Sequence, residues 1–117
     1  MSEVTSAGKV STFASGFHDP TGLAFDSAGN LYVANAFNFS YGASVSLVTP
    51  TANVSTFASG LGLVSPQGLA FDAAGNLYVA NLGNETVSKV SPAGAVSTFA
   101  TVGYVPVSLA FDAAGKL

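Results

Sequence analysis

The sequence predicts an all-β protein made of β-propeller blades, each a sheet of four antiparallel strands. The pentapeptide Val-Ser-Thr-Phe-Ala occurs three times, at residues 10–14, 54–58 and 96–100. The apolar tetrapeptide Leu-Ala-Phe-Asp also occurs three times, beginning at Leu23, Leu69 and Leu109. Each interval holds several short strand patterns separated by turn residues. Self-similarity at a spacing of 40 to 46 residues, with four strands per unit, is typical of propeller blades.

The chain divides into two full units and two partial ones. The expected units are a partial blade over 1–14, blades over 15–58 and 59–100, and a partial blade over 101–117. A blade needs neighbours on both faces, and propeller rings hold about 4 to 8 blades. We therefore expect an incomplete ring, completed in a homo-oligomer or in a longer propeller. Two chains of nearly three blades forming a six-bladed dimer are the first expectation.

The second unit gives the clearest strand order. Residues 69–72 form a short apolar strand, and residues 72–76 a turn whose glycine suits a positive φ. Residues 77–81 are rich in strand-forming types. Residues 86–90 alternate apolar and polar, as a half-buried strand does. Residues 96–100 complete a set of four strands, called a to d in chain order.

The other units align on this one. A proline, at positions 20, 66 or 106, lies three residues before each strand-a leucine, where it interrupts no hydrogen-bonded ladder. The first unit has four additional residues in its b–c connection, within residues 36–42. Residues 1–4 match the end of a strand c, and the C-terminal unit supplies strand a and the start of strand b.

Composition restricts the classes of partner. Hydrophobic residues make up 49% of the chain and charged residues only 8%, with a net charge of -3 and no arginine. Neither nucleic acid nor an anionic membrane suits such a surface. No apolar run approaches the ~20 residues of a membrane span, and residues 1–20 have no secretory-signal pattern. Without cysteine there is no disulfide and no thiolate nucleophile.

A motif in two copies carries a family resemblance. Residues 20–35 read Pro-Thr-Gly-Leu-Ala-Phe-Asp-Ser-Ala-Gly-Asn-Leu-Tyr-Val-Ala-Asn, and residues 66–81 repeat them with few changes. This pattern is similar to the NHL-repeat signature. The resemblance implies a propeller, most often six-bladed, used mainly for binding. Gluconolactonase-type hydrolases and streptogramin (virginiamycin B) lyases are distant relatives with similar propellers, but none of their catalytic motifs is found here.

The acidic residues do not indicate a catalytic pair. Asp26, Asp72 and Asp112 occupy one repeat position before the a–b turn, where an aspartate accepts backbone N–H groups. The remaining acids are Glu3, Asp19 and Glu85, and none has another acid near it in sequence. We therefore expect no catalytic residues and no metal ligands.

The best candidates for binding lie on the face of the propeller where the d–a and b–c loops both emerge. His18 is the only histidine, and two interpretations remain open: a base oriented by Asp19, or a polar residue before a proline. Asn35 and Asn81 end strand b, where each either offers an amide oxygen to a ligand or caps the turn. The extended b–c loop brings three aromatics within five residues, for ligand contact or for covering a blade edge. The expected ligand-binding residues are His18, Asp19, Asn35, Phe37, Phe39, Tyr41, Asn81 and Glu85.

The function expected from these features is a non-catalytic binding or scaffold module without a cofactor. Its ligand would be a small molecule, a sugar or a peptide, bound on the loops of the rigid scaffold. Two alternatives stay open. The chain is part of a propeller lyase or lactonase-like enzyme with a metal near the axis, or it is a designed or idealised repeat scaffold with no ligand.

Overall fold

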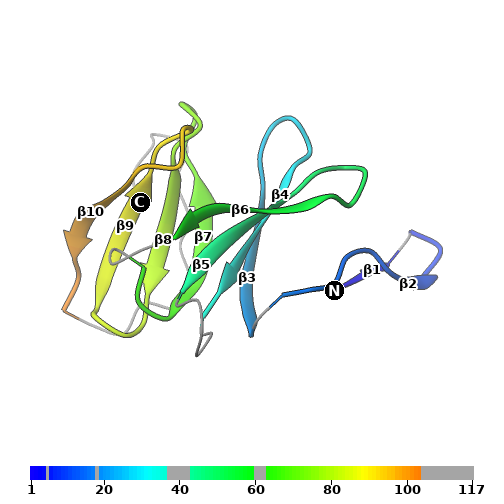
Figure 1. The fold of residues 1–117 in the computed structure, drawn as a ribbon, viewed down its shortest axis with the longest axis horizontal. Helices are drawn as coiled ribbons and strands as arrows, with labels where there is room; N and C mark the ends of the chain where they lie inside the picture. Colours follow the sequence, from blue (N-terminus) through cyan, green and yellow to red (C-terminus); the bar gives the residue numbers. More distant parts are fainter. Residues whose placement is uncertain (5, 18, 37–42, 60–62, 104–117) are drawn as a thin grey trace.

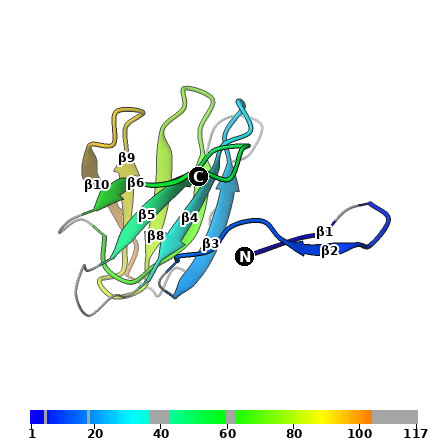
Figure 2. The same cartoon turned by 45° about the vertical axis from the view of Figure 1, so that its right-hand side comes forward.

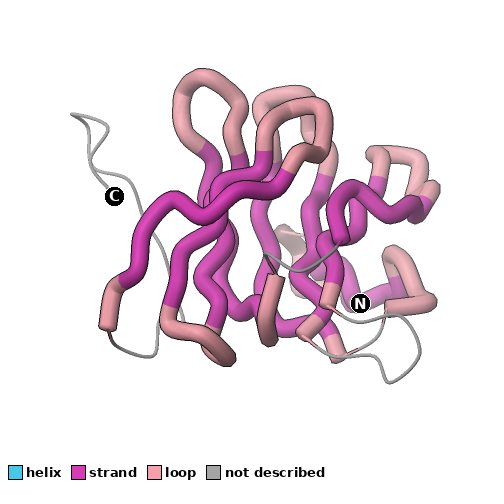
Figure 3. Tube along the Cα trace, turned by 60° about the vertical axis from the view of Figure 1, so that its left-hand side comes forward, coloured by secondary structure: helices cyan, strands magenta, loops and turns pink. Residues whose placement is uncertain are grey.

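The computed structural model describes residues 1–4, 6–17, 19–36, 43–59 and 63–103, and this part of the chain holds strands and no helix (Figures 1 and 3). No helix there is long and apolar enough to cross a membrane. The strands, in chain order, are β1 (Ser2–Val4), β2 (Val10–Thr12), β3 (Pro20–Phe25), β4 (Leu31–Asn35), β5 (Ser44–Val48), β6 (Val54–Ser59), β7 (Pro66–Phe71), β8 (Leu77–Asn81), β9 (Thr86–Val90) and β10 (Val96–Thr101).

Ten strands in this part form two four-stranded sheets and one two-stranded sheet. The order is β3-β4-β5-β6 in the first blade and β7-β8-β9-β10 in the second, with all neighbours antiparallel. The two sheets stand face to face in Figure 1, and β1–β2 lies beside β3 on the outer side, as Figure 2 also shows. The fold class expected from the repeats is confirmed: these are all-β blades, and the described sheets do not close into a ring.

The two blades share one register. Leu31 pairs with Val48 across β4 and β5, just as Leu77 pairs with Val90 across β8 and β9. A one-residue slip would turn every apolar side chain to the other face of its sheet. The hydrophobic pattern of each repeat therefore fixes the same pairing twice.

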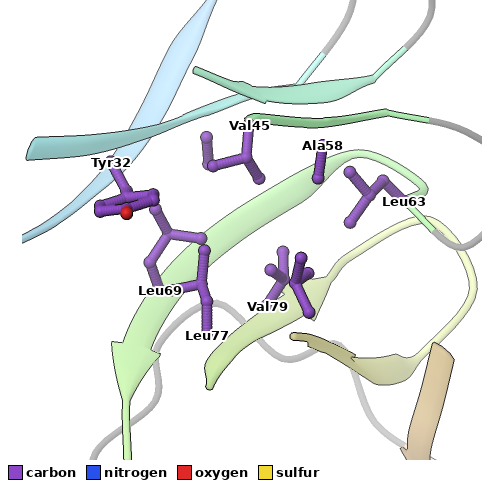
Figure 4. Packing of buried hydrophobic residues seen from close by; sticks show 9 residues of the cluster. Tyr32, Val45, Ala58, Leu63, Leu69, Leu77 and Val79 are labelled. Carbon is purple, nitrogen blue, oxygen red and sulfur yellow. The ribbon is translucent and has the colours of Figure 1, made fainter. Parts of the chain in front are cut away.

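Both central strands are buried along their whole length. In β4 and in β8 every residue is buried, which requires that both faces of the sheet be covered. Tyr32 and Val45 of the first blade pack against Leu69, Leu77 and Val79 of the second (Figure 4). Burying a leucine or valine side chain of this kind stabilises the fold by about 1.5–3 kcal/mol. The main core thus lies between the two blades.

The other face of the first blade has a smaller core. Leu31, Val33 and Val48 are buried there against Ala14, and Phe13 packs at the margin. These contacts come from residues that flank the two strands of the small sheet, and the sheet itself projects from the first blade (Figures 1 and 2).

The inner strands of the two blades touch. β3 and β7 lie close along their first residues, and Thr21 Oγ1 donates a hydrogen bond to the carbonyl oxygen of Pro66 at 2.6 Å. A Cβ atom on Gly22 would overlap the carbonyl oxygen of Gln67. The glycine therefore allows the two backbones to approach as closely as they do.

Strand a is longer than the sequence predicts. We expect it over residues 69–72, but β7 begins at Pro66, and Pro66 pairs with Asn81 ahead of a register irregularity. A proline fits the first residue of a strand, because the ladder there needs no N–H from it. By contrast β2 ends at Thr12, two residues before the expected end of strand d.

Candidate functional site

The end of the two sheets at which β3 and β7 begin and β4 and β8 end is here called the loop face. Of the predicted binding residues, His18, Phe37, Phe39 and Tyr41 lie outside the described residues. The structure brings Asp19 beside the end of β4, where its carbonyl oxygen accepts the N–H of Ala36 at 3.1 Å. Glu85 lies in the tight turn after Asn81, and the side chains of Asp19 and Glu85 are both exposed.

Asn81 is completely buried and bonded on both sides of its amide. Its Nδ2 donates to Ser88 Oγ at 2.8 Å and to Thr86 Oγ1 at 3.2 Å. Its Oδ1 accepts the backbone N–H of Val64 at 3.1 Å. The side chain therefore ties the d–a connection to strands b and c, which is a structural role. Its predicted contact with a ligand stays a prediction.

The side-chain nitrogen of Asn35 donates hydrogen bonds as that of Asn81 does, but its oxygen differs from that of Asn81. Its Nδ2 donates to Ser46 Oγ at 2.9 Å and to Ser44 Oγ at 3.2 Å. Its Oδ1 is buried and has no hydrogen-bond partner in the described part of the chain. Residue 18 has the same repeat position as Val64, whose N–H bonds to Asn81, and it lies outside the described part. A buried acceptor without a donor is costly, and among the described residues Asn35 Oδ1 is the one buried side-chain polar atom of this kind.

Both exposed acids of the loop face have a left-handed backbone. Asp19 has a φ of 50° and Glu85 a φ of 56°. Ser65, at the repeat position of Asp19, has the same φ of 50°. The bend before strand a is thus part of the blade, and the acid on it is specific to the first blade. The fixed bend holds the Asp19 carboxylate outside the start of the inner strand β3.

The opposite end of the sheets, called the turn face, carries the repeated aspartates. Asp72 Oδ1 accepts the N–H groups of Ala74 and Asn76, each at 2.9 Å. Its Oδ2 accepts Asn76 Nδ2 at 2.9 Å and the Tyr78 hydroxyl at 3.3 Å. The hydrogen bond from the Asn76 side chain, followed by those from the two backbone N–H groups, lowers the pKa of Asp72 despite its partial burial. The carboxylate thus organises the a–b turn.

Asp26 makes the same contacts in the first blade. Burial raises the pKa of Asp26, but the hydrogen bonds from Asn30, Ala28 and Tyr32 together outweigh it and leave the pKa lowered. Burial, together with the negative charge of Asp26, raises the pKa of Tyr32, so this phenol stays protonated and donates.

A cavity of about 420 Å³ opens between the blades on the turn face. The ring of Tyr32 meets Phe57 and Phe71 edge-on, with centroids 4.9 and 4.8 Å apart, and these three rings form its apolar wall. Its lining residues are Phe25, Asp26, Ser27, Tyr32, Phe57, Phe71, Asp72, Ala73, Ala74, Gly75 and Pro92. Sequence reasoning placed every candidate on the loop face and missed this cavity. The signal for it was the phenylalanine that ends strand a in each repeat.

The acids of the described residues do not gather into a metal centre. Within the described ranges no group of three or more His, Cys, Asp or Glu lies close enough together to hold a metal ion.

Comparison with known proteins identifies the fold. No protein-family model matches the sequence, and no curated protein sequence matches it significantly. A virginiamycin B lyase from Staphylococcus aureus is similar in structure, with a TM-score of 0.65 at 11% identity, over 82% of this chain and 32% of that chain. A putative gluconolactonase has a TM-score of 0.70 at 20% identity, over 93% of this chain and 45% of that chain. A protein of unknown function from Bacteroides caccae has a TM-score of 0.60 at 18% identity, over 82% and 36%.

These similarities correct the expectation that the chain is not an enzyme, and they confirm the expected β-propeller fold. The expectation that the chain is not an enzyme is contradicted, because two of the similar structures are a lyase and a putative gluconolactonase. Its physical basis was the lack of a catalytic motif, and a motif search is insensitive where identity is only 11–20%. The chain spans less than half the length of each of these proteins. At such identity the likeness shows the fold, and the described sheets are blades of a β-propeller.

Proposed function

We propose that this chain contributes blades to a propeller enzyme of the lyase or lactonase kind, with its chemistry on the loop face. The observation that carries the proposal is the structural likeness to a virginiamycin B lyase and to a putative gluconolactonase, over 82% and 93% of the chain. The NHL-type character of the blades is part of the same proposal and is supported by the motif that residues 20–35 and 66–81 share.

Asp19 is the residue to which we assign the base. Both kinds of reaction need one: a lactonase base takes a proton from the water that attacks the carbonyl carbon, and a lyase base takes a proton from carbon as the leaving group departs. The Asp19 carboxylate is exposed on the loop face, at the start of the inner strand β3. Its left-handed backbone, held by the hydrogen bond from Ala36 N–H, fixes its position. Positioning of this kind is what an effective base requires.

In lactone hydrolysis the proton balance is closed. Asp19 accepts a proton from water while the water oxygen bonds to the carbonyl carbon. The ring C–O bond then breaks, and the released alkoxide takes up the proton that Asp19 holds, which regenerates the base. The product is a hydroxy acid, and no oxidant or second substrate is needed.

The alternative considered from the sequence includes a metal near the axis, but the described residues do not assemble a set of ligands for one. The amide nitrogens of Asn35 and Asn81 donate to serine and threonine hydroxyls, and Asn81 Oδ1 accepts the N–H of Val64, so in the described part of the chain Asn35 Oδ1 is the single oxygen of these two amides without a partner. The two exposed acids are not part of any metal-ligating group within the described ranges. No step of the proposed reaction is therefore routed through a metal.

The test compares Asp19→Asn with Ser65→Asn. Both positions have a φ of 50°, and asparagine tolerates this region, so each variant keeps its backbone. Ring opening of a panel of small lactones by the full chain is followed by a pH indicator, and elimination by ultraviolet absorbance. Loss of a general base lowers kcat by about 10²–10⁴-fold, so we expect this loss in Asp19→Asn alone.

Two results would overturn the assignment. Equal turnover in Asp19→Asn and the unmodified chain would remove Asp19 as the base. No turnover of any substrate by a chain whose assembled state has been verified would remove the enzymatic proposal itself.

A further inference from the structure

One face of the first blade lacks the cover that the second blade has. Leu69 of β7 is 8% exposed, whereas Leu23, at the same repeat position in β3, is 54% exposed. Phe25 is 66% exposed, whereas Phe71 at the equivalent position is half-buried against the first blade. Large apolar side chains at these exposures on neighbouring strand positions indicate a surface made to be covered.

The sheet beside this face holds only the outer half of a blade. Val4 pairs with Val10 across β1 and β2, as Val90 pairs with Val96 across β9 and β10. By this register β1 and β2 are strands c and d. In the described part of the chain no strands a and b stand beside them. A largely apolar cavity of about 310 Å³ lies there instead, and its lining residues are Met1, Ser2, Glu3, Phe13, Leu23, Phe25 and Leu31.

The chain contains the matching piece of sequence. Residues 106–117, outside the described residues, repeat residues 66–77, which form strand a, the a–b turn and the first residue of strand b. The segment therefore has the repeat identity of strand a and of the first residue of strand b in the absent half-blade, and it includes no positions that match residues 78–81.

The same copy is not suited to supply it. The strand that precedes the segment, β10, lies on the far side of the molecule from β1–β2 (Figure 1).

We propose that the uncovered face formed by Leu23, Phe25 and the inner edge of β1 is the docking site for residues 106–117 of a second copy of this chain. Leu117 of the partner subunit then stands opposite Val4, as Leu77 stands opposite Val90 within the second blade. The partner's strand a lies along β3, as β3 lies along β7. The exchange is reciprocal, so two joints close one ring of twofold symmetry.

Cysteine cross-linking tests the register directly. The chain has no cysteine, so every disulfide formed is an introduced one. Directly opposed residues of an antiparallel pair fall within the Cα separations that a disulfide accepts. We expect a mixture of the single variants Val4→Cys and Leu117→Cys to give, on oxidation, a covalent heterodimer on a non-reducing gel. Ser97→Cys mixed with Leu117→Cys is the matched control, because Ser97 is exposed on β10 at the far side.

Light scattering of the full chain gives the second readout, which is independent of any enzymatic activity. We expect a mass of twice the 11.6 kDa chain. Phe25→Ser should weaken the dimer at least tenfold, and Val54→Ser, which changes an exposed residue of the outer strand β6, should not.

Three outcomes would overturn the proposal. They are a monomer at every concentration, a discrete assembly larger than two, or a cross-link that forms within one chain in a Val4→Cys, Leu117→Cys double variant. A chain that forms the dimer but turns over no lactone would contradict the proposed activity and would not contradict the docking site.

Discussion

At the scale of single residues, one carboxylate in each blade organises a whole turn. Asp72 accepts four hydrogen bonds, two of them from backbone N–H groups that would otherwise face solvent. The sequence predicted the backbone bonds, because an aspartate before such a turn commonly makes them. It did not predict the bond from the Tyr78 hydroxyl, which depends on how strands a and b pair.

Protonation of these aspartates should weaken the fold. Because the hydrogen bonds of the folded state lower the pKa of Asp72 below its ordinary 3.8, the folded chain binds this proton less readily than the unfolded one. The stabilisation is therefore fully present above about pH 4 and is lost as the pH falls through the lowered folded value. Asp72→Asn should cost about 1 kcal/mol at pH 7 and reduce this pH dependence.

Urea unfolding at pH 7 and at pH 3 measures both effects. Glu85→Gln, at an exposed position in the turn after β8, is the control and should leave the curve unchanged. An Asp72→Asn variant as stable as the unmodified chain at pH 7 would contradict the role assigned to this carboxylate.

At the scale of elements, strand order and pairing follow from the repeat. The strand bounds that were predicted wrongly depend on contacts between strands. Residues 77–81 and 86–90 are strands with the predicted bounds. The start of β7 at Pro66 was missed, because local propensity does not reveal that Asn81 provides a pairing partner for it.

The candidate site was less predictable than the strands. Asn35 and Asn81 were expected on the loop face and lie there, yet both are buried, and their partners are hydroxyl groups on strand c. Burial of a polar residue is decided by the neighbouring strands and not by its own sequence context. The inter-blade cavity depends on the packing of two sheets, and the phenylalanine that ends strand a marks its wall only once that packing is known.

The close approach of β3 and β7 predicts a severe effect of one added methyl group. Gly22→Ala places a Cβ against the carbonyl oxygen of Gln67, which belongs to the backbone and cannot rotate away. Such overpacking costs about 1–3 kcal/mol or more, and we expect the two blades to separate slightly. Thermal unfolding by circular dichroism measures the loss. Thr98→Ala, at an exposed position of β10, is the control. Unchanged stability in Gly22→Ala would mean that the inner strands are farther apart than described.

At the scale of the whole molecule, the two outer faces are unlike the protected interface between the blades. The N-terminal side exposes Leu23 and Phe25, and the C-terminal side exposes 52% of Phe99. The position corresponding to Phe99 in the first blade is Phe57. Each of these phenylalanines meets the strand-b tyrosine of its own blade edge-on, but only Phe57 is half-buried against the core between the blades. The exposed N-terminal face therefore corresponds to the side that the second blade presents to the first. The exposed C-terminal face corresponds to the side that the first blade presents to the second.

Stability should consequently depend on protein concentration. If the proposed second copy covers these faces, the folded state is favoured by mass action, and Tm rises as the concentration increases. Differential scanning calorimetry over a hundredfold range of concentration measures the shift, and Phe25→Ser should reduce it. A Tm independent of concentration would indicate a monomer that is stable without its cover.

The matched register of the two blades has a consequence for how such a gene can change. Because the contact between one blade and the next uses the same positions on each side, a tandem duplication of one repeat inserts a unit whose two faces already fit its neighbours. Recombination between the segments that encode residues 20–35 and 66–81 would preserve the repeat pattern. A change by one whole repeat therefore preserves the contact between blades, whereas a substitution inside a blade that has neighbours on both sides is constrained on both of its surfaces at once.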